Sequence, residues 1–548
     1  MTWAVPPVAR EQLVLFASSL DEVIPEDHLV RVVDEILRSL DWTKFEAEYH
    51  GRLGARPIHP RVLASVIFYG HLTRVRSSRQ LEAALWCRVD FRWLAEGWQV
   101  DHSTLSNFRK DFAELLRGVN VQFGLLAYQL GVTTLTQFGF DGTRLRASNA
   151  RQRSVSVEKL GEIEQQLQQT FDELEKHVAD ADALDEEQLG GASLQRVSKD
   201  LVKTKNRLAA VRAAQAEIAR VKAAAEAVPK RIPLTDPESR ITPNKEGGFA
   251  PNYTPLGNVD MESGLILDGT VIQNTDEEQH LEASLTALEE GFAAAGLEQH
   301  VESLTADGLF VTGPNLAALA QRETTFYGPI APQPEIVKRA DGSVPIPSEQ
   351  WAELPLVVVQ KGTNGQPDQR QLAKEAFLYD PALNCYWCPQ GEKLSYTKTT
   401  SEVLPGTQRR VQRQRYAADA SACESCPLRA KCLKKGEGWQ RTLSHDQYEP
   451  HRAALRERMT APAAQAKRKT RQTEGERPFA MVKQVFGIRQ FLLRGLTNVK
   501  KEWSWITSSV NLLVMTRWRR AHPDRSLKLL SPPSRAPGAR ASPVLVGP

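Results

Sequence analysis

The stretch from Thr470 to Gly495 reads TRQTEGERPFAMVKQVFGIRQFLLRG and organises the chain. Its apolar residues recur at the i, i+3, i+7 spacing of a helix with one buried stripe: Phe479, Val482 and Phe486. Glu476 and Lys483 share a neighbouring stripe, two turns or roughly 10 Å apart. This spacing suits a carboxylate that holds a metal ion beside a cation that holds a phosphate. A core helix with a solvated charged face would show the same pattern.

Composition limits the classes of protein to which the chain can belong. The chain has 548 residues, of which 41% are hydrophobic and 25% charged, as in globular proteins with two or more domains. The net charge of +4 is small, so any nucleic-acid binding would depend on local basic surface. The first residues, MTWAVPPVAREQ, lack a signal-peptide pattern, and the apolar run Trp503 to Met515 is too short to span a bilayer. We therefore expect a cytoplasmic protein.

Residues 1–125 read as a helical region. Pro60 opens one predicted helix, and Ser77 caps the start of another. Short helices with polar caps and Arg-rich turns suit a helix-turn-helix DNA-binding domain, and a plain helical bundle fits the pattern equally well. Cys87, beside Trp86, is expected to be a buried core thiol.

Two aspartates follow predicted strands. Asp141 comes after a strand from Thr134 to Phe140, and Asp307 comes after a short apolar strand from Val301 to Ala306. Both precede glycine, so an Asp that initiates a turn is the alternative. Asp260 competes for the second position, but it lies between two predicted paired strands, where a turn role is expected.

Residues 155–228 are rich in Glu, Gln, Lys, Ala and Leu and contain few aromatic residues. They predict two long helices joined near Gly190 and Gly191, forming an inserted antiparallel hairpin. We assign it the role of a spacer or dimerisation arm, without chemistry.

Five of the six cysteines cluster late in the chain. Cys385 and Cys388 form one Cys-x-x-Cys pair, Cys423 and Cys426 form another, and Cys432 follows. Four thiolates from two such pairs predict a tetrahedral structural zinc site, for which Cys432 is a further candidate ligand. An iron–sulfur cluster that includes Cys432 is the alternative, and reduced thiols without a metal are a third reading.

Basic residues surround the helix that carries Glu476: Lys467, Arg468, Lys469, Arg471, Arg477, Lys483, Arg489 and Arg494. Such a surface suits the phosphates of DNA.

The Glu476 stretch resembles the glutamate-bearing helix of DDE transposases of bacterial insertion sequences, in the IS1182-like branch with a DUF772-type N-terminal domain. In that branch the catalytic Glu precedes a Phe by three residues and a Lys by seven, and a Gly and an F-L-L-R-G-like run follow. Here the matching residues are Glu476, Phe479, Lys483, Gly487 and the run from Phe491 to Gly495. Glu474 could be the ligand only under a two-residue slip that breaks the spacing to Phe479.

Other segments share the resemblance, which spans roughly residues 10–520. Asp101 to Arg109 matches a D-x-S-T-L-x-x-F-R-like segment, Asp141 lies in an F-D-G-T motif, and Asp307 lies in an A-D motif whose glycine is shifted. Related families place a Tyr and an Arg before the Glu. Arg471 stands one residue early, and alanines occupy the place of the Tyr.

The resemblance implies an α/β fold: an RNase H-like catalytic core with a helical N-terminal domain. We expect a DNA-binding domain at 1–125, a catalytic domain at 130–520 and a disordered tail at 521–548. Two insertions would interrupt the catalytic domain: the hairpin at 155–228 and the Cys-containing segment at 326–465. Asp141, Asp307 and Glu476 would be the catalytic acids and would hold two Mg²⁺ or Mn²⁺ ions about 3.5 to 4 Å apart, with Asp141 bridging them.

The expected partners follow from the same resemblance. Arg109, Arg471, Lys483, Arg489 and Arg494 would contact DNA, namely the terminal inverted repeats of the element and the target. The chain would act as a nucleoid-associated homodimer in a synaptic complex, without a membrane. A DNA-binding protein that has lost catalysis and an RNase H-like nuclease without strand transfer are the alternative functions.

Overall fold

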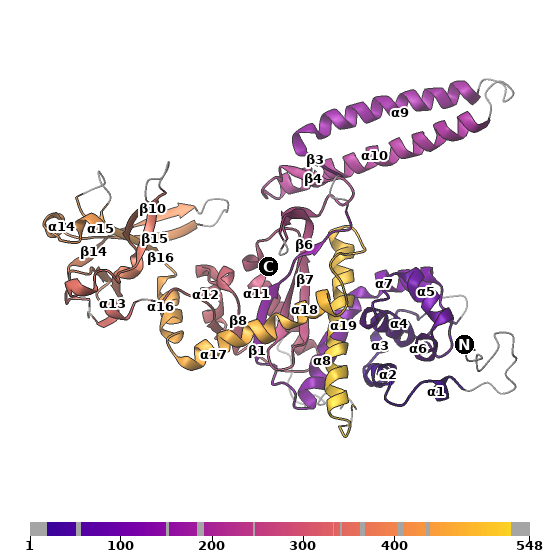
Figure 1. The fold of residues 1–548 in the computed structure, drawn as a ribbon, viewed down its shortest axis with the longest axis horizontal. Coiled ribbons are helices and arrows are strands. Elements are labelled where there is room, and N and C mark those ends of the chain that lie inside the picture. The colour runs from indigo at the N-terminus through magenta and orange to yellow at the C-terminus, as the bar shows by residue number, and fades with distance from the viewer. Residues whose placement is uncertain are drawn as a thin grey trace, which may run out of the picture.

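A computed structural model describes residues 19–50, 56–149, 153–182, 191–244, 247–332, 334–339, 342–361, 368–403, 410–433, 439–525 and 527. Four parts are visible in Figure 1: a helical N-terminal part, a central sheet with its helices, a long helical hairpin, and a separate small β-rich part. Most of the tail predicted to be disordered lies outside the described residues.

The N-terminal part consists of short helices whose starts are set by polar caps. The helices are α1 (Leu20–Val23), α2 (Leu29–Ser39), α3 (Thr43–Ala47), α4 (Pro60–Leu72), α5 (Ser78–Cys87), α6 (Val89–Leu94), α7 (His102–Asp111) and α8 (Leu116–Gln129). Pro60 stands in the first turn of α4, and Ser77 caps α5 through a capping box with Gln80, so both predicted helix starts are confirmed. Cys87 is exposed, which corrects the prediction of a buried thiol, because α5 ends there at the surface.

The central sheet is seven-stranded within the described residues, with the order β2-β6-β1-β8-β9 and with β5 and β7 also paired to β6. Its strands are β1 (Gln137–Gly142), β2 (Leu145–Arg146), β5 (Arg240–Pro243), β6 (Phe249–Asp260), β7 (Ile266–Ile272), β8 (Ser303–Thr305) and β9 (Thr325–Tyr327). β1 is antiparallel to β6, which is antiparallel to β7, whereas β1, β8 and β9 run parallel. The predicted strands before Asp141 and Asp307 are therefore neighbours.

Helices cover both faces of this sheet. Phe138 of β1 packs against Phe292 of α11 (Leu281–Ala294) on one face. The alternate residues of the strand point the other way, where the segment before Glu476 and the helix α18 (Arg477–Gln484) lie. The long C-terminal helix α19 (Leu496–Ala521) packs on the same side, and its Trp503 ring stacks on Phe479 of α18. The fold thus brings residues near 140, 305 and 476 to one edge of the sheet.

Asn511 joins α19 to the sheet through hydrogen bonds to the backbone of Ile266. Its Oδ1 accepts from the Ile266 N–H at 2.7 Å, and its Nδ2 donates to the Ile266 carbonyl at 2.8 Å. The side chain is fully buried and also donates to Oδ1 of Asn120 in α8 at 3.1 Å. Buried backbone groups without a partner are costly, so this residue fixes the helix on β7.

Asn511→Leu is expected to lower the midpoint of thermal unfolding. The substitution keeps the side-chain volume but leaves the N–H and C=O groups of Ile266 without partners, at a cost of roughly 2 to 4 kcal/mol. Differential scanning fluorimetry of the full chain measures the shift. Thr497→Ala, an exposed change on the same helix, is the matched control and should leave the midpoint unchanged; equal midpoints for both variants would contradict the assigned role.

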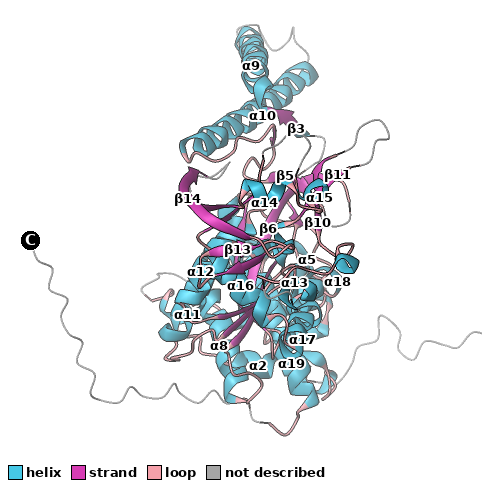
Figure 2. Cartoon of the chain, turned by 90° about the vertical axis from the view of Figure 1, so that its left-hand side faces the viewer, coloured by secondary structure: helices cyan, strands magenta, loops and turns pink. Residues whose placement is uncertain are grey.

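The helical hairpin rises from the core, as Figure 2 shows at the top of the molecule. It consists of α9 (Leu160–Asp182) and α10 (Gly191–Ala223), with the two-stranded ladder of β3 (Ser154–Ser156) and β4 (Arg231–Pro233) at its base. Arg212 of α10 pairs with Glu164 of α9 at 2.9 Å. The prediction of two long helices is confirmed, whereas their junction near Gly190 falls on residues outside the description.

The small β-rich part has its own core. Its five-stranded antiparallel sheet contains β12 (Leu378–Asp380), β13 (Cys385–Trp387), β14 (Lys393–Val403), β15 (Arg410–Ala417) and β16 (Thr442–Asp446). A second ladder pairs β10 (Leu356–Gln360) with β11 (Gln369–Leu372), and the short helices are α13 (Glu335–Arg339), α14 (Ala420–Glu424) and α15 (Arg429–Cys432). Two helices connect this part to the rest: α16 (Glu449–Arg458), which packs on α12 (Gly313–Gln321), and α17 (Pro462–Thr470).

None of the described helices is long and apolar enough to cross a membrane.

Candidate active site

Asp141 and Asp307 lie at adjacent strand ends. The parallel register pairs Gly139 of β1 with Thr305 of β8, and each aspartate is two residues further along the chain. Neighbouring strands are about 4.8 Å apart, so both carboxylates belong to one edge of the sheet. Asp141 is 8% exposed and accepts a hydrogen bond from the Gly142 N–H at 2.8 Å. Asp307 is half-buried and caps the turn Gly308–Phe310 by accepting from the Leu309 N–H at 2.8 Å.

Glu476 reaches the same edge from a different segment. It precedes α18 and follows a five-residue π-helical turn, Arg471–Gly475, that continues α17. The Cα of Gly475 lies 3.8 Å from the place that a Cβ on Gly139 would take, so this turn rests directly on β1. The Glu476 side chain is about half exposed at 49%, and it is therefore open to a ligand.

Arg471 connects two of the three acids. Its Nη2 lies 3.1 Å from Oε1 of Glu476, and its Nη1 lies 3.6 Å from Oδ2 of Asp141. The guanidinium is largely buried, with a side-chain exposure of 14%. The carboxylates of Asp141 and Glu476 thus share the Arg471 cation.

The π turn explains why Arg471 stands one residue early in the sequence. The Glu476 N–H donates to the carbonyl of Arg471 at 3.2 Å, a five-residue separation instead of the four of an α-helix. The wider turn accommodates the extra residue, so Arg471 and Glu476 lie on the same side of this segment. π turns of this kind are frequent at functional sites.

A fourth carboxylate lies near this edge and was not predicted. A Cβ added at Gly142 would collide with the carboxylate of Glu277, which belongs to the turn Glu277–His280. In the sequence, Asp276, Glu277 and Glu278 form an acidic run typical of a solvated surface, and no motif separates Glu277 from its neighbours.

The competing acids have other partners. Glu474 pairs with Arg477 at 3.0 Å. Asp260 is buried, pairs with Phe138 near the opposite end of β1, and accepts hydrogen bonds from the Ser263 N–H at 2.9 Å and the Thr133 hydroxyl at 2.8 Å. Burial raises the pKa of Asp260 to about 6. The predicted turn role of Asp260 is confirmed.

Of the residues predicted to contact DNA, Arg109 faces inward. Its Nε and Nη2 atoms are buried and have no hydrogen-bond partner among the described residues, and burial lowers its pKa to about 10. The backbone carbonyl of Arg109 accepts from the Trp505 indole N–H at 3.0 Å, which ties α7 to α19. The prediction of a DNA contact at Arg109 is therefore corrected: the residue is part of the packing between α7 and α19.

The other predicted DNA contacts follow Glu476 along the chain. Lys483 is half-buried on α18, and Arg489 and Arg494 are exposed on the segment that follows it. This segment runs beside β2, where the Arg146 N–H donates to the carbonyl of Arg489 at 3.1 Å and Arg494 Nε donates to the carbonyl of Ser148 at 3.0 Å. The basic residues thus extend along the chain that leads away from Glu476.

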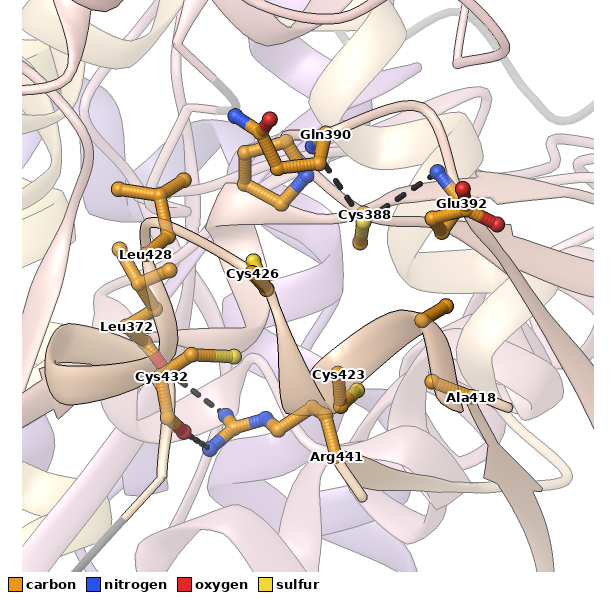
Figure 3. A pocket seen from close by; sticks show the side chains of 12 residues that line it. Leu372, Cys388, Gln390, Glu392, Ala418, Cys423, Cys426, Leu428, Cys432 and Arg441 are labelled. Carbon is orange, nitrogen blue, oxygen red and sulfur yellow. Dashed lines mark hydrogen bonds between the residues drawn. The ribbon is translucent and has the colours of Figure 1, made fainter. Parts of the chain in front are cut away.

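The cysteines group differently from the prediction. Cys388, Cys423, Cys426 and Cys432 line one cavity (Figure 3). Cys385 is fully buried in β13 and does not line it. Strand alternation accounts for the difference, because residues three apart in an extended segment such as Cys385 and Cys388 point to opposite faces. Burial raises the pKa of the Cys432 thiol to about 12, and the other three thiols add to the shift.

As the structure places them, no three carboxylate, thiol or imidazole side chains of the described residues lie close enough to hold one metal ion. This holds for the acids around Arg471 as well as for the thiols.

Comparisons with known proteins match two segments of the chain. Residues 18–111 match a family described as Transposase domain (DUF772), and residues 387–516 match one described as Transposase DDE domain. Neither a curated protein nor a solved structure matches the chain.

Both matched families are transposase families, which indicates a protein of DNA transposition. The matches are consistent with the IS1182-like DDE transposases with a DUF772-type N-terminal domain that the sequence resembles. Glu476, Arg471 and the four thiols around the cavity lie within the second matched segment, and Asp141 and Asp307 lie outside both.

Proposed function

We propose that this transposase nicks the ends of an insertion sequence and joins the freed 3′-OH to target DNA, with Asp141, Asp307 and Glu476 as its catalytic acids. The observation that carries the proposal is the Arg471 guanidinium, which lies between Asp141 and Glu476 at the strand edge that also bears Asp307. Residues far apart in the sequence thus lie together, with the positive charge of Arg471 between the negative charges of Asp141 and Glu476.

The sheet supports an RNase H-like catalytic core. Three antiparallel strands, β7, β6 and β1, are followed by the parallel strands β8 and β9, which is the arrangement expected of that fold. The first acid lies at the end of the central strand β1, the second follows its parallel neighbour β8, and the third lies between the π-helical turn and α18. The hairpin and the β-rich part are insertions into this core in the proposed domain division.

The acids fit divalent metal ions, which DDE transposases use, usually Mg²⁺. Asp141, Asp307 and Glu476 are oxygen donors of the kind that Mg²⁺ prefers, and the cation of Arg471 already lies between two of them. When bound, such ions would activate the attacking oxygen and stabilise the leaving oxygen. The chain itself positions the carboxylates on a rigid strand edge and supplies Arg471 to the phosphate that enters between them.

The partner in this proposal is DNA: the terminal inverted repeats and then the target. Lys483, Arg489 and Arg494 would hold phosphates next to the acids, and the N-terminal helices would recognise the ends. A homodimer would bring the two ends together in a synaptic complex.

An oligonucleotide assay tests the proposal. Labelled terminal-repeat DNA, full-length protein and Mg²⁺ should give a nick with a 3′-OH at the element end, and adding target DNA should give the joined product. Nicking without joining would indicate a nuclease without strand transfer. Binding of the ends without any nicking would indicate a DNA-binding protein that has lost catalysis.

Arg489→Ala combined with Arg494→Ala is expected to weaken binding of end DNA to a similar degree for all sequences. Each lost phosphate contact should lower the slope of log K against log salt by about 1. Fluorescence anisotropy over a salt series measures both effects. Arg415→Ala, on strand β15 of the β-rich part and ion-paired with Glu402, is the control; an unchanged slope in the double variant would contradict the phosphate contacts.

A further inference from the structure

We infer that Cys388, Cys423, Cys426 and Cys432 bind one Zn²⁺ ion as a four-thiolate structural site, and that Cys385 is not a ligand. The inference concerns the β-rich part and does not depend on the proposed DNA chemistry. It replaces one of the four ligands that the sequence pattern predicts.

The four thiols surround a common space. They line a cavity of about 30 Å³, and Figure 3 shows their sulfur atoms on different sides of it. Cys388 follows β13, whereas Cys423, Cys426 and Cys432 come from the helical segment α14–α15. A shared ion would therefore fasten this segment to the sheet. A cavity of this volume suits a single ion better than a cluster of several iron and sulfur atoms.

The turn after Cys388 is built around its sulfur. The backbone N–H groups of Gln390 and Glu392 both donate to Cys388 Sγ at 3.3 Å. The turn is closed by the Gly391 N–H, which donates to the Cys388 carbonyl at 2.8 Å, and Gly391 adopts a φ of 77° that favours glycine. Backbone donors that converge on a sulfur stabilise its thiolate form and orient it, as they do around metal ligands.

A buried cation beside the thiols is a second, independent observation. Arg441 is 9% exposed, and its guanidinium donates at 2.8 Å to the carbonyls of Cys432 and Leu372. No carboxylate of the described residues pairs with it, and its Nε has no partner there. A buried charge without a counter-charge is costly. Four thiolates around Zn²⁺ carry a net charge of about −2 and would provide that counter-charge.

Closing the site requires the sulfur atoms to move toward one another. The thiols are not yet at the separation of ligands on one ion. Zn–S bonds of about 2.3 Å place tetrahedral sulfurs roughly 3.8 Å apart. Each Cys side chain has a rotatable χ1 torsion, through which its sulfur can move toward the others.

The site would stabilise a part of the chain that has a small core. The buried apolar cluster of the β-rich part comprises residues such as Tyr386, Leu394 and Tyr416, with the four cavity thiols packed against it. Small cores commonly need a metal or disulfide to fold stably. Zinc is thereby assigned a structural role, with four protein ligands and no open position for substrate.

Metal analysis of the purified full-length protein tests the inference. We expect about one Zn²⁺ per chain for four thiolate ligands. Ser substitution of Cys388, Cys423, Cys426 or Cys432 should lower zinc affinity by at least about tenfold against a chelator. The matched controls are Cys385→Ser, a buried thiol outside the cavity, and Cys87→Ser, an exposed one. Both should keep full zinc content.

A second measurement remains decisive if the ligand variants fail to fold. Wild-type protein exchanged with Co²⁺ should show the intense sulfur-to-cobalt charge-transfer and d–d bands of a tetrahedral four-thiolate site, and a mercurial reagent should release the metal as the thiols are titrated. The inference is overturned by protein that holds no metal, by iron with sulfide in place of zinc, by Co²⁺ bands without thiolate character, or by zinc loss in Cys385→Ser equal to that in Cys388→Ser.

Discussion

Asp141→Asn and Glu476→Gln are each expected to abolish end cleavage while leaving end binding within a few-fold of wild type. Both substitutions keep shape and volume but remove a negative charge that would hold a divalent ion. The loss of such a ligand removes several kcal/mol of transition-state stabilisation, which corresponds to a rate decrease of about a thousandfold or more. Single-turnover cleavage of labelled terminal-repeat DNA measures the rate, and anisotropy measures the binding.

Glu474→Gln is the matched control for Glu476→Gln. It lies two residues earlier, is 33% exposed against 49% for Glu476, and is paired with Arg477 rather than with Arg471. It should retain cleavage within a few-fold. Substantial cleavage by Asp141→Asn or Glu476→Gln would show that the acid is assigned wrongly, and equal losses in Glu474→Gln would show that the whole turn, rather than one carboxylate, is sensitive.

The positions of the strand-end acids could be predicted from sequence because strand patterns are local. Apolar residues in strand patterns identify β1 and β8, and an Asp at the end of such a strand lies at the edge of the sheet. That the two strands are neighbours is a long-range property, and the local pattern does not contain it. The resemblance to the transposase family supplied this information, and the parallel register of β1 and β8 agrees with it.

The errors concern side chains whose positions depend on packing. Cys385 and Cys388 fit a Cys-x-x-Cys pattern, yet a strand places them on opposite faces, and only the alternation of the strand could have warned of this. Arg109 follows a family motif, but its guanidinium is buried where α7 meets α19, a contact between segments almost four hundred residues apart. Cys87 is apolar in character but ends its helix at the surface. In each case the position of the side chain depends on tertiary packing, which residue type alone does not predict.

Arg471→Ala is expected to lower the cleavage rate by about a hundredfold or more, because removing one preorganised donor from a charge-stabilising site has this effect in other enzymes. In the sequence, Arg471 stands one residue away from the position of the family's Arg, so residue spacing alone does not identify it as that Arg. The π turn removes the doubt about geometry, since it sets the guanidinium between Asp141 and Glu476. Arg471→Lys, which keeps the charge but loses the planar fork, should fall between alanine and wild type.

Two roles for Arg471 can be separated by metal titration. If the guanidinium only neutralises the acids, Arg471→Ala removes a competing cation, divalent ions bind more tightly, and cleavage reaches the wild-type rate at saturating Mg²⁺. If it also contacts the scissile phosphate, the rate stays low at every Mg²⁺ concentration although less metal is needed for half-saturation. We expect the second result, because a donor between two carboxylates lies where a phosphate would gain charge during cleavage. Full recovery at high Mg²⁺ would limit Arg471 to holding the acids before DNA binds.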